Sequence, residues 1–149
     1  MSQRLSRTER EAFLSDVRIG VLSVDSDQPD RAPVSAPVWY GYTPEAGVWV
    51  IMNGRSRKGT AIETARRFVL VVQSETIPYR YVTVEGPVTE IRATDTEKDL
   101  LPLAIRYLGE QRGRSYAKEW EAAGSAETDL VYVMKPTHWN TADFTDDLA

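Results

Sequence analysis

The sequence predicts a mainly β protein: an antiparallel barrel with peripheral helices, formed by a single domain over residues 1–149. Two observations support this fold class. Short segments rich in β-branched and aromatic residues recur along the chain, separated by turns rich in Gly, Pro, Asp and Ser. These segments do not alternate with long helices, as the strands of a parallel Rossmann sheet do.

Six segments are predicted as strands because they are apolar or β-branched and are bounded by turn residues. In chain order they are Arg18–Asp25, Ala32–Tyr42, Val48–Asn53, Phe68–Val72, Tyr79–Arg92 and Asp129–Met134. Pro33 and Pro37 cannot donate ladder hydrogen bonds, so part of the second strand is expected to be an edge or a bulge. Gly86 and Pro87 interrupt the fifth strand and predict a bulge or a barrel corner there.

Four short helices are predicted around these strands. They cover Thr8–Asp16, Lys58–Ala65, Leu100–Leu108 and Tyr116–Ala123. Thr8 and Glu11 fit a capping box at the start of the first helix. The third helix has apolar residues at i, i+3, i+4, i+7 and i+8, and Gly109 fits its C-terminal stop. Pro102 should lie in the first turn of that helix, because elsewhere it would cause a kink.

The composition limits the chemistry that the chain can perform. Hydrophobic residues make up 42% and charged residues 27%, as in ordinary globular proteins. The chain has no cysteine and only one histidine, His138, which excludes thiolate chemistry and metal sites built on several histidines. A net charge of −4 argues against a nucleic-acid partner. No apolar run approaches membrane-spanning length, so we expect a cytoplasmic protein without a membrane partner.

One stretch, Met52–Thr60, joins an apolar strand to a helical segment and carries the best candidate for a binding site. Within this stretch, four consecutive residues contain three cations: Arg55, Arg57 and Lys58. Ser56 can cap the helix, and Gly54 and Gly59 allow the backbone to approach a ligand closely. A helix N-terminus also offers free N–H groups and a positive dipole end, so the corner suits a phosphate. A solvated basic turn is the alternative interpretation.

Acid–base and nucleophilic machinery is sparse. A Ser-His-Asp triad would have to use His138, and no G-x-S-x-G elbow accompanies it. Neither a P-loop nor a G-x-G-x-x-G motif is present. We therefore assign no catalytic residue and expect an enzyme of this composition to take its chemistry from a cofactor. Trp39 and Trp139 lie beside backbone irregularities and fit a flat ligand, whereas Trp49 is better explained as core.

Two motifs together resemble the pyridoxamine 5′-phosphate oxidase-like flavin-binding split barrels: NGRSRKGTAI at 53–62 and YVTVEG at 81–86. The RIGVLSVD and APVW segments are also similar to this superfamily, and are nearest to its flavin- or deazaflavin-dependent oxidoreductase branch. The resemblance covers roughly residues 6–92. It implies a six-stranded Greek-key split barrel, a homodimer, and a flavin at each subunit interface whose phosphate is held by Arg57 and Lys58.

The sequence also departs from the oxidase itself. The oxidase carries an Arg and a Lys at positions that here correspond to Ala36 and Gly41, and a Gln where this chain has Tyr81. Oxidation of vitamin B6 is therefore not expected. The resemblance implies FMN as the cofactor, with the deazaflavin coenzyme factor 420 as the alternative. The residues expected at the cofactor are Val38, Trp39, Met52, Asn53, Arg55, Ser56, Arg57, Lys58, Tyr81 and Trp139.

The function expected from this resemblance is transfer of hydride or electrons between the cofactor and a small organic substrate. Two alternatives remain: a non-catalytic protein that binds or sequesters flavin, and a barrel that has lost flavin and binds another ligand such as haem. The segment 136–141 shows no helical or strand period. It either covers its own barrel end or reaches the neighbouring subunit, with Trp139 against the flavin edge, and we favour the second arrangement.

Overall fold

The computed structural model describes residues 2–147 and contains eight strands and six helical segments within that range. The strands are β1 (Gly20–Val24), β2 (Val34–Val38), β3 (Gly41–Thr43), β4 (Gly47–Asn53), β5 (Arg67–Gln73), β6 (Arg80–Ala93), β7 (Asp129–Met134) and β8 (His138–Asp143). The helical segments are α1 (Arg7–Ser15), α2 (Arg57–Ala65), η1 (Thr96–Leu100), α3 (Leu101–Leu108), α4 (Glu110–Ala122) and η2 (Ser125–Glu127). None of the helices within residues 2–147 combines the length and hydrophobicity needed to cross a bilayer.

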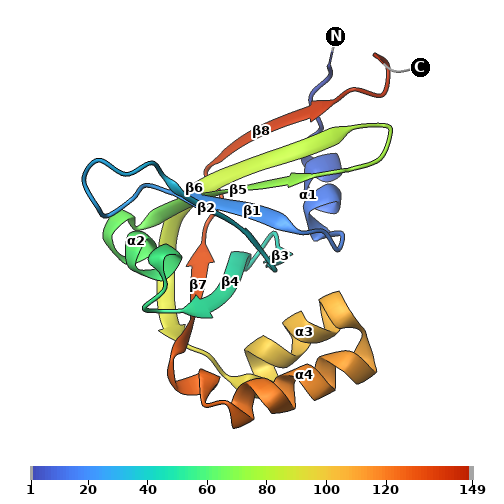
Figure 1. Cartoon of the computed structure of the whole chain (residues 1–149). Helices are drawn as coiled ribbons and strands as arrows, with labels where there is room; N and C mark the ends of the chain where they lie inside the picture. Colours follow the sequence, from blue (N-terminus) through green and yellow to red (C-terminus); the bar gives the residue numbers. More distant parts are fainter. Residues whose placement is uncertain (1, 148–149) are drawn as a thin grey trace.

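The strands form one antiparallel sheet that curls into a split barrel, in the order β2-β1-β5-β6-β7-β4-β3, with β8 added beside β6 (Figure 1). The long strand β6 links both parts: its first half pairs with β5 and β8, and its second half pairs with β7. The register shifts between Val88 and Glu90, directly after the interruption predicted at Gly86 and Pro87. The predicted fold class, a mainly β antiparallel split barrel with peripheral helices, is confirmed.

The count of six strands is too low, for two reasons. The predicted strand Ala32–Tyr42 breaks after Val38, because Trp39 and Tyr40 leave the ladder before β3 begins. Its first part, β2, is an edge of the sheet, as its prolines predict. The tail also forms a strand, β8, which was not among the six predicted strands because segment 136–141 shows no strand period. Pairing with β6 overrides its weak polar pattern.

The barrel interior is apolar, and two helices close it. Side chains with no exposed surface include Leu22, Val48, Val50, Leu70, Val72, Val82 and Val84. Phe13 and Leu14 of α1 and Ala61 and Ile62 of α2 are buried in the same core. Burial of α1 and α2 in one core therefore fixes both helices relative to the sheet.

Two helix starts differ from the prediction. The capping box of α1 consists of Ser6 and Glu9, not Thr8 and Glu11: the Ser6 Oγ accepts the Glu9 N–H at 3.2 Å, and the Glu9 carboxylate accepts the Ser6 N–H at 2.9 Å. α4 begins six residues before the predicted Tyr116–Ala123. Its buried residues include a glycine, Gly113, which masks the apolar period.

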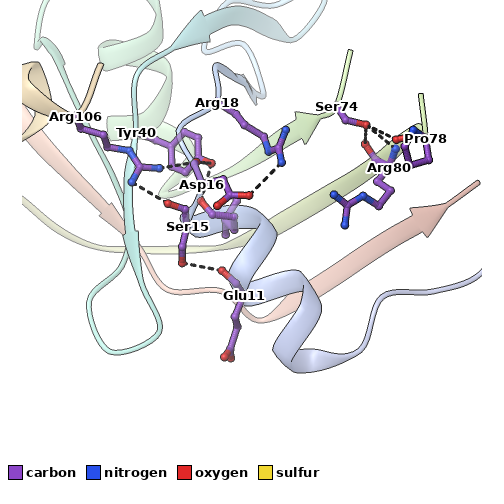
Figure 2. A network of polar contacts seen from close by, with 10 residues as sticks. Glu11, Ser15, Asp16, Arg18, Tyr40, Ser74, Pro78, Arg80 and Arg106 are labelled. Atoms are coloured by element: carbon purple, nitrogen blue, oxygen red, sulfur yellow. Dashed lines mark hydrogen bonds and ion pairs between the residues drawn. The ribbon is translucent and has the colours of Figure 1, made fainter. Parts of the chain in front are cut away.

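The α3–α4 hairpin extends from one side of the barrel (Figure 1), and hydrogen bonds from two arginines help to hold it there. At its base, the Arg92 guanidinium donates to both carboxylate oxygens of Asp99, at 2.7 and 2.8 Å. Those hydrogen bonds hold the pKa of the Asp99 carboxyl below its usual value. Farther along, Arg106 donates to the carbonyl oxygens of Ser15 and Asp16 at 3.0 and 2.8 Å (Figure 2). Pro102 lies in the first turn of α3, as predicted.

Candidate functional site

The basic corner between β4 and α2 forms as predicted, with Ser56 as the N-cap of the helix. The Ser56 Oγ accepts the N–H of Gly59 at 3.0 Å and donates to the carbonyl oxygen of Asn53 at 2.6 Å. The side chain of Asn53 accepts the N–H of Arg55 at 2.8 Å. The corner is thus shaped by its own hydrogen bonds, which leave the next donors directed outward from the helix start.

These next donors have no partner within residues 2–147. The backbone N–H groups of Arg57 and Lys58 have no acceptor there, and the side chains of Arg55, Arg57 and Lys58 form no hydrogen bond or ion pair there. The first turn of α2 contains no acidic residue. Free N–H groups, a helix dipole and unpaired cations at one point favour binding of an anion such as a phosphate.

A groove of about 250 Å³ adjoins this corner, between the barrel and the α3–α4 hairpin. Four of the predicted site residues line it: Val38, Trp39, Met52 and Lys58. The helical segments η1, α3 and α4 supply the other wall through Leu100, Leu103, Tyr116 and Trp120. Most of the residues that line the groove are therefore apolar or aromatic, and Lys58 connects it to the basic corner.

One carboxylate, Asp129, also lines the groove, but its oxygens are already engaged. One oxygen accepts the indole N–H of Trp120 at 3.0 Å, and the other accepts the hydroxyl of Thr128 at 3.1 Å. Asp129 thereby fixes Trp120 in the groove wall.

The ring of Trp39 is held by the hairpin. It stacks on Tyr107 with ring centroids 5.0 Å apart and planes 5° from parallel, and it contacts Tyr116 at 5.4 Å with a tilt of 51°. Trp39 is half-buried as a result. It reaches the groove as part of an aromatic cluster, not as an isolated ring beside a strand break.

The other predicted residues are distributed differently. Asn53, Ser56, Arg55 and Arg57 belong to the corner itself and do not line the groove. Tyr81 lies near the start of β6, where its ring is 6.4 Å from that of Phe144.

Trp139 also lies outside the groove of its own chain, on β8. Its ring meets Tyr42 edge-on at 6.3 Å, and the guanidinium of Arg10 lies 4.4 Å from the ring centroid. Trp139 therefore packs against its own barrel. A role for it at the cofactor of a neighbouring subunit stays a prediction.

Sequence reasoning missed the contribution of the hairpin to this groove. Its helices were predicted, but nothing in their periodicity indicates that Tyr107, Tyr116 and Trp120 pack beside Trp39 or Asp129. The available signal was the density of aromatic residues on two predicted helices of an otherwise acidic chain, which exceeds what two surface helices need.

Fold and site together define a split β-barrel with a basic corner beside a groove lined largely by aromatic and apolar residues. The chain belongs to the pyridoxamine 5′-phosphate oxidase family: the sequence model of that family matches residues 6–141. No curated protein sequence gives a significant match.

Solved structures show the same fold at low sequence identity. An F420 reductase superimposes with a TM-score of 0.67 at 21% identity, covering 87% of this chain and 94% of that one. A conserved hypothetical protein from Mycobacterium tuberculosis superimposes with a TM-score of 0.74 at 17% identity, covering 97% of this chain and 89% of that one. The haem storage protein HutZ from Vibrio cholerae superimposes with a TM-score of 0.61 at 11% identity, covering 94% of this chain and 96% of that one. These likenesses establish the fold alone, since structures of one fold can bind different ligands.

Proposed function

We propose that this chain binds a flavin-type cofactor at the corner between β4 and α2 and acts as an oxidoreductase on a small organic substrate. The observation that carries the proposal is the juxtaposition of two features. The N–H donors of Arg57 and Lys58, which have no acceptor within residues 2–147, lie at the start of α2, and the groove lined by Val38, Trp39 and Met52 adjoins them. A phosphate with a flat ring system attached needs both features in this arrangement.

The residues present fit such a group. Arg57, Lys58 and their backbone N–H groups would hold its phosphate, and the groove wall would exclude water from its ring. When bound, a flavin or deazaflavin supplies hydride transfer, so the protein need not provide an acid or base of its own. FMN is the cofactor that the sequence implies. The likeness to an F420 reductase supports the deazaflavin as the alternative.

The groove is small for a whole cofactor, because about 250 Å³ is below the usual volume of ligand pockets. We propose that a second copy of the chain completes it, as a homodimer. Val21 on β1 is 38% exposed and pairs with Pro37 of β2 and Val71 of β5. Pro37 also lines the groove, so the apolar outer face of this sheet continues into the site.

Haem is the second candidate, raised by the likeness to HutZ. It is less well supported by this chain. The one histidine, His138, is exposed on β8, contacts the hydroxyl of Thr137 at 3.0 Å and lies outside the groove. An axial ligand for haem iron in the groove would have to be another residue.

Equilibrium dialysis against FMN, the deazaflavin and haemin, with absorbance spectra of the retained ligand, tests the proposal. We expect saturable binding of FMN or the deazaflavin with one site per chain. Retention of haemin together with failure of both flavin-type ligands would overturn it. A bound cofactor that no reductant or acceptor converts would instead support the non-catalytic flavin-binding alternative.

A further inference from the structure

The side chain of Tyr107, on α3, lies at the break in strand pairing between β2 and β3. β2 ends at Val38 and β3 starts at Gly41, so the backbone of Trp39 and Tyr40 lies outside the ladder. The hydroxyl of Tyr107 accepts the Tyr40 N–H at 3.1 Å. The same hydroxyl lies 2.7 Å from the carbonyl oxygen of Arg18 and 3.2 Å from that of Tyr40, to which it can donate. One side chain therefore replaces strand hydrogen bonds at this break.

The ring of Tyr107 has a second contact, its parallel stack on Trp39 at 5.0 Å. Trp39 lines the groove, whereas Tyr107 does not. The hydroxyl fixes where the ring of Tyr107 lies, and the ring fixes the plane of Trp39. The neighbouring residue Arg106 anchors the same turn of α3 to the end of α1 (Figure 2), so this turn cannot slide along the barrel.

We propose that Tyr107 is a positioning residue of the cofactor groove. It acts through Trp39, whose ring plane it sets in the groove wall, and it does not touch the ligand. This proposal rests on the proposed function for the effect on cofactor affinity. The orientation of Trp39 can be measured without any ligand.

The test compares Tyr107→Phe with Tyr40→Phe as the matched control. Each variant loses one phenol hydroxyl with a 2.7 Å hydrogen bond to a backbone carbonyl, that of Arg18 for Tyr107 and that of Leu14 for Tyr40. Both should lower the melting temperature. Only Tyr107→Phe should also raise the dissociation constant of FMN, by about tenfold, because the ligand must then immobilise the Trp39 ring that Tyr107 no longer holds.

The second readout uses protein labelled with 5-fluorotryptophan, with the Trp39 resonance assigned from Trp39→Phe. In the ligand-free protein, the ¹⁹F resonance of Trp39 should shift or broaden in Tyr107→Phe and stay in place in Tyr40→Phe. An unmoved Trp39 resonance in Tyr107→Phe, or an equal loss of FMN affinity in both variants, would overturn the proposal. If the parent protein binds neither FMN nor the deazaflavin, the proposed function fails, and the ¹⁹F comparison still decides whether Tyr107 positions Trp39.

Discussion

Gly59, in the first turn of α2, lies against the carbonyl oxygen of Asn53 at the end of β4: a Cβ at residue 59 would be 2.7 Å from that oxygen. The same Cβ would be 2.8 Å from the hydroxyl of Tyr132 and 3.0 Å from the carbonyl oxygen of Gly54. Two of these three neighbours are backbone atoms, which cannot rotate away. The close approach of α2 to β4, and with it the geometry of the basic corner, therefore requires glycine at this position.

Gly59→Ala should consequently lower the free energy of unfolding by about 1–3 kcal/mol, the usual cost of overpacking. It should also weaken FMN binding, because α2 has to move away from the corner. Chemical denaturation and dialysis measure the two effects. Thr64→Ala, at an exposed position of the same helix, is the control and should change neither quantity appreciably. A Gly59→Ala protein with parental stability would show that the contact is not tight in solution.

The proposed dimer makes Val21→Asp an informative change. A carboxylate on the apolar outer face of β1 should prevent a second copy from covering it. Sedimentation should find the parent as a dimer and the variant as a monomer, with weakened FMN binding if the partner completes the groove. Thr64→Asp adds the same charge elsewhere on the surface and should leave the dimer intact. A parent that sediments as a monomer at micromolar concentration would contradict the dimer.

Asp99 provides a prediction about pH. The hydrogen bonds from Arg92 lower the pKa of its carboxyl in the folded protein, so the folded state binds the proton less readily than the unfolded state. The resulting stability is present above the ordinary Asp pKa of about 4 and is lost as pH falls through the lowered value. Asp99→Asn should lower the free energy of unfolding by about 1–3 kcal/mol at pH 7. That difference should shrink below about pH 4, and a difference independent of pH would contradict this account.

Most of the barrel was predictable because its strands are short, apolar and bounded by strong turn signals. The errors lie where tertiary pairing overrides local pattern. Trp39 and Tyr40 belong to a β-rich segment, yet their backbone leaves the ladder because Tyr107 satisfies it. The tail 138–143 has no clear alternation, yet it pairs with β6. Neither outcome depends on nearby sequence, so period and propensity could not reveal it.

The site divides in the same way. The corner at residues 53–59 was predictable since its cap, cations and glycines are consecutive in sequence. The groove was predictable only on its barrel side, from Val38, Trp39 and Met52. Its other wall comes from helices that begin more than forty residues after Met52 in the sequence. No feature of those helices predicts which strand they pack against. The resemblance to a family supplied the prediction of a flavin-type cofactor, which physical pattern alone did not.

The tail provides a further prediction. Deleting the chain from Thr137 onward removes the whole β8 ladder together with the contacts of Trp139 with Tyr42 and Arg10, so the melting temperature should fall. Trp139→Ala should lower it too, by a smaller amount. FMN affinity per folded molecule is the second readout. If that affinity is unchanged in Trp139→Ala, Trp139 has no place at the cofactor of the neighbouring subunit. A Trp139→Ala protein that melts at the parental temperature would contradict the packing role of Trp139 in its own barrel.

The measurement that tests the central claim most directly compares ligands with and without the phosphate. FMN and riboflavin differ only in that group. Their affinities should be measured for the parent, Arg57→Ala and Lys58→Ala. We predict that the parent binds FMN more tightly than riboflavin by about 1–3 kcal/mol, the range for charge-assisted hydrogen bonds, and that each variant reduces this difference. Equal affinity for FMN and riboflavin in the parent, or a difference that both variants retain, would contradict binding of the cofactor phosphate at the start of α2.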